Sequence, residues 1–119
     1  LAGQLLGGNV LGVTADPSVC TELKALMEEN RLGVTIKNQV WASDSNTFAW
    51  KGVPALTLNR DGFGMHTRHD TVEYISPRGL EEGSKTLCTA AAWAANEPHF
   101  SFLREIPEEM QRELEKYFA

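Results

Sequence analysis

Hydrophobic and polar positions alternate with different periods along the first forty residues. Residues 9–14 are mostly apolar and predict a buried strand. Apolar residues then recur every three or four positions up to about Asn30, which predicts a helix capped by Asp16 or Ser18. Residues 34–41 alternate at a period of two and predict a half-buried strand. This order of strand, helix and strand favours a layered α/β sheet.

The middle of the chain is predicted to contain a third strand and a long loop. Residues 43–46 are polar and predict a loop, and residues 47–51 predict one short helical turn. Residues 52–58 are again apolar and predict a strand, in which a proline near the start is tolerated. Residues 59–71 predict a long loop, and such loops commonly carry functional side chains on a rigid scaffold.

Two helices are predicted in the last part of the chain. The first begins after Ser76 and ends near Asn96, and we expect its inner face to include Leu80, Leu87, Ala91 and Ala94. The second is charged and runs from about residue 106 to 117, with a thin apolar stripe made of Met110, Leu114, Tyr117 and Phe118. We therefore divide the chain into an α/β portion, residues 1–97, and a helical tail, residues 98–119.

Composition and charge narrow the range of partners. Of the 119 residues, 42% are hydrophobic and 23% are charged, which is ordinary for a globular protein of one domain or less. The net charge of −5 and the scattered basic residues argue against a nucleic-acid partner. No apolar run reaches the length of a membrane span. Because residues 1–3 lack a methionine and a basic segment, we expect no signal peptide and a piece of a longer polypeptide, of unknown compartment.

Cys20 and Cys88 are the only cysteines in the sequence. Both fall within apolar helical patterns, where cysteine usually behaves as a small buried hydrophobic residue. This interpretation is favoured over a disulfide between the two, because two cysteines do not make a disulfide framework. Neither has a histidine nearby in the sequence, so a catalytic thiol is not predicted.

The strongest candidate for chemistry is the histidine of the predicted long loop. His66 follows Gly64, and Asp70 lies four positions later. Imidazole in such a loop can bind a metal through one ring nitrogen, while a carboxylate fixes its orientation. The alternative is an ordinary loop histidine in a hydrogen bond. His69 is also close, but the glycines argue against a helix, so chelation by both histidines has weak support.

The polar residues before the third predicted strand support no other chemistry by themselves. Ser43 and Ser45 lack the G-x-S-x-G pattern of a nucleophilic serine. Asp44 has two interpretations, since it could support a metal site or simply stabilise a turn between serine and asparagine. Taken one at a time, these residues therefore predict no reaction.

Three motifs, taken in order, resemble the final third of the di-zinc aminopeptidase family. They are Ser43-Asp44-x-x-x-Phe48, then Lys51-Gly52-Val53-Pro54-Ala55-Leu56, then His66-Thr67-x-x-Asp70-Thr71-x-Glu73-x-Ile75. The family includes bacterial aminopeptidases, glutamate carboxypeptidase and the transferrin-receptor ectodomain, with glutaminyl cyclase as a more distant relative. The resemblance extends over roughly residues 9 to 95, and the ordered set is more specific than any one motif.

The resemblance implies a three-layer α/β sandwich of the zinc-exopeptidase type, of which this chain is the C-terminal part. In the family, two zinc ions are bound by two histidines, a bridging aspartate and two further carboxylates, and a glutamate acts as general base. Only the last histidine maps onto this chain, at His66, and the general base is expected upstream. The resemblance also assigns supporting roles: Ser43 and Asp44 near the metal centre, Thr67 and Asp70 as braces of the loop, and Met65 beside the substrate side-chain pocket.

Two departures from the family pattern are informative. The family often has a histidine where this chain has Ser45, but that histidine is not normally a zinc ligand. Glutaminyl cyclases tend to carry a tryptophan at the position of Met65, so methionine there favours a peptidase. The tail from Pro98 onward matches no part of the family pattern.

The resemblance implies a metalloprotease that hydrolyses N-terminal peptide bonds or amino-acid amides with zinc-activated water. We expect the 119-residue chain alone to be inactive, because one ligand cannot hold a zinc pair. The main alternative is a degenerate, non-catalytic member that uses the fold for binding, as the transferrin receptor does; retention of His66 favours the enzyme. A stand-alone interaction domain is the third interpretation. A sheet cut within a domain exposes an edge strand and an apolar face, so we expect self-association or marginal stability.

Overall fold

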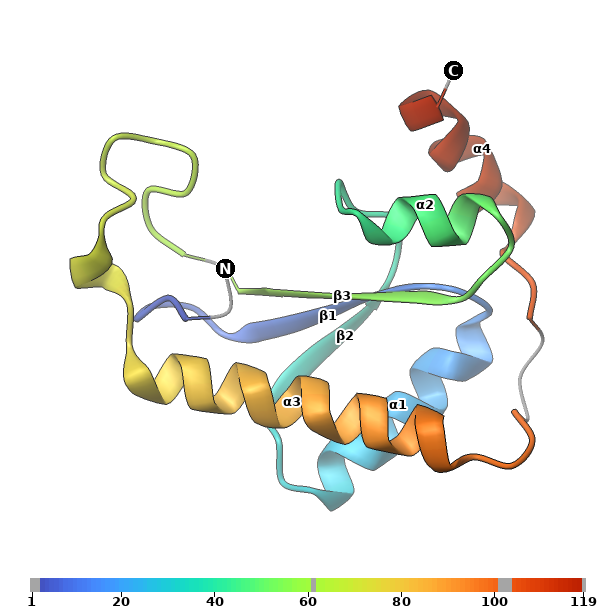
Figure 1. The fold of residues 1–119 in the computed structure, drawn as a ribbon, viewed down its shortest axis with the longest axis horizontal. Coiled ribbons are helices and arrows are strands. Elements are labelled where there is room, and N and C mark those ends of the chain that lie inside the picture. Colours follow the sequence, from blue (N-terminus) through green and yellow to red (C-terminus); the bar gives the residue numbers. More distant parts are fainter. Residues whose placement is uncertain (1–2, 61, 101–103, 119) are drawn as a thin grey trace.

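A mixed sheet lies at the centre of the molecule, with helices on both of its faces (Figure 1). The computed structural model describes residues 3–60, 62–100 and 104–118. Within them, the strands are β1 (Asn9–Thr14), β2 (Val34–Asn38) and β3 (Ala55–Arg60). The strand order is β2-β1-β3, with β1 parallel to β2 and antiparallel to β3. The expected α/β class is therefore confirmed.

One face of the sheet packs against α1 (Pro17–Glu29) and α3 (Pro77–Asn96), which Figure 1 shows below the strands. Leu11 and Val13 point to this face and form the main core with apolar residues from both helices, namely Val19, Leu23, Met27 and Ala90. The predicted spacing of α1 is confirmed. Of its two proposed caps, Asp16 is the one used, and its carboxylate accepts a hydrogen bond of 2.9 Å from the Ser18 N–H.

The inner face of α3 differs from the prediction, although its cap at Ser76 and its end near Asn96 are confirmed. The buried positions are Gly79, Gly83, Thr86 and Ala90. The prediction of an inner face that includes Leu80, Leu87 and Ala91 is wrong: the two leucines are 49% and 47% exposed and Ala91 is exposed, while Ala94 is half-buried. Small side chains are needed here because α3 lies close to the main chain of residues 3 and 4. A Cβ at Gly79 would lie 3.0 Å from the Gln4 carbonyl oxygen.

The opposite face carries α2 (Ser45–Trp50) and α4 (Glu108–Phe118). Ala49 and Ala55 are buried there with three residues of the tail, Ile106, Met110 and Leu114. The stripe predicted for the tail helix is confirmed at Met110 and Leu114, whereas Tyr117 and Phe118 remain about half exposed. The helix α4 thus packs against α2 through a second small core.

Three predicted boundaries are corrected by the structure. Strand β2 ends at Asn38 rather than at residue 41, because the Asn38 amide donates hydrogen bonds to the carbonyl oxygens of Val13 and Ala15 as the chain leaves the sheet. Helix α2 begins at Ser45, inside the predicted polar loop. Strand β3 begins three residues later than residue 52, because Gly52 adopts a left-handed turn with φ of +77°.

Both cysteines are free, so a disulfide does not form. Cys20 is half-buried, but Cys88 is exposed on the outer side of α3, where the prediction of a buried residue is wrong. None of the helices in the described ranges has the length and apolar character needed to cross a bilayer.

Candidate functional site

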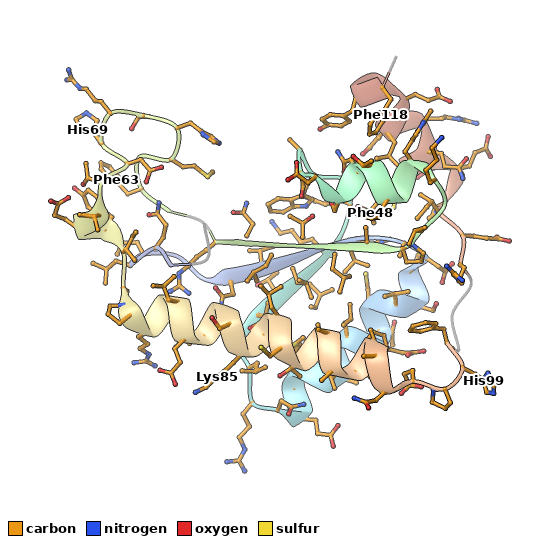
Figure 2. The ribbon with its side chains drawn as sticks, viewed as in Figure 1. Phe48, Phe63, His69, Lys85, His99 and Phe118 are labelled. Atoms are coloured by element: carbon orange, nitrogen blue, oxygen red, sulfur yellow. The ribbon has the colours of Figure 1, made fainter. Side chains whose placement is uncertain are left out.

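The segment between β3 and α3 contains the candidate histidine, and we call residues 62–71 the histidine loop. Figure 2 shows Phe63 and His69 on this loop, which extends away from the sheet. Gly64 has a φ of +75°, and a Cβ added to it would lie 3.1 Å from the main-chain carbon and oxygen of His69. Only glycine fits both requirements without strain. The sequence therefore places a tight turn directly before His66.

Thr67 is the centre of the hydrogen bonds within the histidine loop. Its hydroxyl donates to the Gly64 carbonyl oxygen at 2.6 Å, and its N–H donates to the same oxygen at 2.9 Å. The same hydroxyl accepts from the His69 N–H at 3.1 Å. Asp70 takes part through its main-chain N–H, which donates to the Thr67 carbonyl oxygen at 3.1 Å. These bonds fix the main chain on both sides of His66.

His66 itself is exposed and adopts a left-handed conformation, with a φ of +63°. This conformation is uncommon for residues other than glycine, although histidine adopts it more often than most. The neighbouring His69 is engaged differently: its Nε2 accepts from the Arg68 guanidinium at 3.3 Å, and its ring lies 6.5 Å from that of Phe63. Met65, beside His66, is half-buried.

The motif residues after the loop form a short turn, η1 (Val72–Tyr74), that leads into α3. The Thr71 hydroxyl hydrogen-bonds to the Glu73 carboxylate and lowers the pKa of Glu73 below its ordinary value. The ring of Tyr74 packs against Phe63 with their centroids 5.1 Å apart. These contacts connect the end of the loop back to its beginning.

Ser43 and Asp44 lie in a different part of the fold, directly before α2. The Thr57 hydroxyl donates to Ser43 Oγ at 3.1 Å, and Ser45 Oγ lies 2.7 Å from the same hydroxyl. Asp44 is exposed and its side chain makes no capping hydrogen bond to α2. Ser43 and Asp44 line a cavity of about 380 Å³ together with Phe48.

The described residues do not form a complete metal centre. Within residues 3–60, 62–100 and 104–118, no group of three or more histidine, cysteine, aspartate or glutamate side chains could hold a metal ion. His66, Asp44 and Asp70 are therefore not brought together into one site. A zinc ion needs at least three protein ligands, so His66 fits the role of one ligand and the other ligands of a zinc pair are not supplied here.

Gln4 contacts the histidine loop, although the sequence pattern does not single it out. Its side-chain oxygen accepts a hydrogen bond of 3.1 Å from the Phe63 N–H, 59 positions away. No local pattern indicates such a contact. The one available signal is a glutamine in an otherwise apolar and glycine-rich stretch.

No protein-family model matches the chain, and neither a curated protein nor a solved structure matches it. The ordered motifs and the geometry of the histidine loop are the features that bear on function. Both features concern the same residue, His66.

Proposed function

We propose that this chain is the histidine-bearing C-terminal part of a di-zinc aminopeptidase-like hydrolase. The proposal rests on the conformation and the exposure of His66. It belongs to the most extended of the three ordered motifs, and it lies exposed in a left-handed conformation, spanned by the hydrogen bond from the Thr67 hydroxyl to the Gly64 carbonyl oxygen. Unusual main-chain conformations that the surroundings fix are concentrated at functional sites. An imidazole held in this way is suited to ligation.

The proposal assigns a limited set of roles to the residues of this chain. His66 supplies one imidazole, and the hydrogen bonds of Thr67 hold the loop that carries it. Met65 is half-buried beside His66, where an apolar side chain suits a pocket for a substrate side chain. The remaining ligands and the general base belong to other parts of the intact hydrolase. A bound zinc pair supplies the activated water for hydrolysis of an N-terminal peptide bond or amino-acid amide.

The surfaces of the sheet and of α3 support a larger three-layer sandwich of the zinc-exopeptidase type. Within the described residues, β2 and β3 each pair only with β1, so their outer edges are free. The outer side of α3 exposes Leu80 and Leu87. Free strand edges and neighbouring apolar side chains are normally covered in a native protein. Further strands and helices of the same domain would cover both.

The test uses the complete natural polypeptide that contains residues 1–119. We expect the purified protein to bind two zinc ions per chain and to hydrolyse leucyl-anilide. His66→Ala should remove at least one zinc ion and lower kcat/KM by more than about 100-fold, since even residues that only support a ligand are worth 10–100-fold. His69→Ala is the matched control in the same loop and should retain both properties.

Two results would overturn the proposal. Unchanged zinc content in His66→Ala would exclude His66 as a ligand. A wild-type protein that binds no zinc and hydrolyses no amide would instead favour the non-catalytic binding module.

A further inference from the structure

Gln4 is a polar residue that is almost completely buried outside the main core. Only 5% of its surface is exposed. Buried polar side chains are nearly always hydrogen-bonded, and here the partner is the Phe63 N–H at the start of the histidine loop. The contact thus joins the segment before β1 to the segment that follows β3.

The main chain around Gln4 contacts the residues that follow the histidine loop and lead into α3. The Leu5 N–H donates to the Tyr74 carbonyl oxygen at 2.6 Å, and the Ser76 N–H donates to the Gly3 carbonyl oxygen at 2.7 Å. Gln4 itself pairs with Ile75 in an isolated antiparallel bridge. Residues 3–5 therefore contact both the entry and the exit of the segment that carries His66.

Gln4 is closely packed against two glycines. A Cβ added to Gly62 would overlap the Gln4 side-chain amide, and a Cβ added to Gly79 would press on the Gln4 carbonyl oxygen. A larger residue at Gly62 would therefore shift the Gln4 amide, and one at Gly79, in the first turn of α3, would press on the main chain of Gln4. This packing favours one position of the Gln4 amide.

We propose that Gln4 is a positioning residue for His66, acting as a clamp between the start of the histidine loop and the residues that follow its end. The inference rests on the proposed function of His66 as a zinc ligand. With these residues fixed, the turn centred on Thr67 has few conformations, and the main chain that carries the His66 imidazole is held in one place. Loss of the Gln4 acceptor would release the main chain at Phe63. The free energy of metal binding would then include the cost of ordering the loop. Residues that orient a metal ligand are typically worth 10–100-fold in metal affinity.

The experiment compares Gln4→Met with Gln4→Glu in the complete natural polypeptide. Methionine has a similar length and lacks the oxygen acceptor, whereas glutamate keeps an acceptor oxygen in either protonation state. Gln39→Met is the control, because Gln39 is exposed and its hydrogen bonds to Val13 and Thr14 are made by its main-chain N–H and carbonyl oxygen. The measurements are zinc affinity by competition with a chelator, amide hydrogen exchange at Phe63, and Tm.

We expect Gln4→Met to accelerate exchange at Phe63 and to weaken zinc binding about 10–100-fold. Gln4→Glu keeps an acceptor oxygen, so exchange at Phe63 should be slower in it than in Gln4→Met. Should Gln4→Met fail to fold, Gly62→Ala displaces the Gln4 amide from the other side and should weaken zinc binding in the same way. Faster exchange at Phe63 with unchanged zinc affinity would overturn the positioning role, and unchanged exchange would overturn the clamp.

The two proposals can fail separately. If His66→Ala leaves zinc binding unchanged, the proposed function is wrong and so is the role of Gln4 in metal binding. Exchange at Phe63 would still decide whether the clamp exists, because it does not depend on zinc.

Discussion

The ring of Phe118 stacks on that of Trp50, with centroids 5.3 Å apart and an angle of 23° between their planes. This contact joins the end of the tail helix α4 to the end of α2, on the side of the molecule labelled Phe118 in Figure 2. One turn earlier in α4, Leu114 is completely buried in the second core. The tail helix is thus held by buried apolar surface as well as by the ring pair.

Replacement of Leu114 by alanine should therefore be costly. We expect Leu114→Ala to lower the free energy of unfolding by about 2–5 kcal/mol, because it removes a buried side chain and leaves a cavity. Glu115→Ala, at the exposed neighbouring position, should change it by less than about 0.5 kcal/mol. Urea denaturation followed by circular dichroism measures both. Equal effects of the two variants would mean that α4 does not dock as described.

The end of α2 depends on the conformation of Gly52. The Gly52 N–H donates to the Ala49 carbonyl oxygen, and the Val53 N–H donates to that of Phe48, which are the two bonds of a Schellman motif. A Cβ at Gly52 has open space, but its φ of +77° is unfavourable for an L-residue. We expect Gly52→Ala to lower the free energy of unfolding by about 1–2 kcal/mol.

Gly33→Ala is the matched control for Gly52, since it also has open space around the Cβ and no left-handed φ. It should be neutral, or stabilise the protein by up to about 1 kcal/mol through the lower entropy of the unfolded chain. Thermal unfolding of both variants is the measurement. Equal losses would contradict a specific role of the left-handed turn.

The elements of this fold were predictable where local chemistry determines them. Asp16 and Ser76 cap the helices that follow them, and the apolar spacing of α1 gives its buried face directly. The face of α3 was not predictable from hydrophobicity, because close approach to the Gln4 main chain selects Gly79 over Leu80. Hydrophobic patterns report which side chains avoid water, but not how near two main chains come.

Only those parts of the candidate site that depend on local sequence were predictable. Gly64 and Thr67 are local features of the sequence around His66, and Thr67 belongs to the motif that begins at His66. The contact between Gln4 and Phe63 depends on the antiparallel pairing of β1 with β3, which brings residues near 4 and 63 to the same end of the sheet. A period-two pattern does not reveal which strands pair or in which direction.

The ion pairs of Glu82 predict a pH dependence of stability. Glu82 bonds to Arg78 at 2.9 Å and lies 3.6 Å from the buried Arg60 guanidinium. The hydrogen bond from Arg78 lowers the pKa of Glu82 below its ordinary value near 4.5. Because the pKa is lower in the folded state, the carboxylate stabilises the fold above that value, and the contribution is lost as pH falls through the folded pKa.

Glu82→Gln should consequently destabilise the protein at pH 7, and this effect should shrink as the pH falls below about 4.5, through the folded pKa. Glu29→Gln removes the same charge from α1, outside these ion pairs, and serves as the control. Denaturation at a series of pH values is the measurement. A difference between wild type and Glu82→Gln that stays constant down to pH 3 would show that the charge of Glu82 is not responsible.

The two cysteines should differ in reactivity. Cys88 is exposed on α3, whereas Cys20 is half-buried in α1 and burial raises the pKa of its thiol. Because the thiolate is the species that reacts, iodoacetamide at pH 8 should label Cys88 first. Peptide mass spectrometry over time measures the order. Labelling of Cys20 at the same rate would mean that α1 opens readily.

The 119-residue chain by itself should neither hydrolyse leucyl-anilide nor bind zinc tightly. The reason is the number of ligands: the described residues bring no three metal-binding side chains together, and one imidazole cannot hold a hydrolytic zinc ion. The isolated chain and its His66→Ala variant should therefore give the same zinc content and the same background rate. Hydrolysis that His66→Ala abolishes would show that the site is assembled within this chain, or between two copies of it, and His69, Asp44 and Asp70 would then be the next ligands to replace.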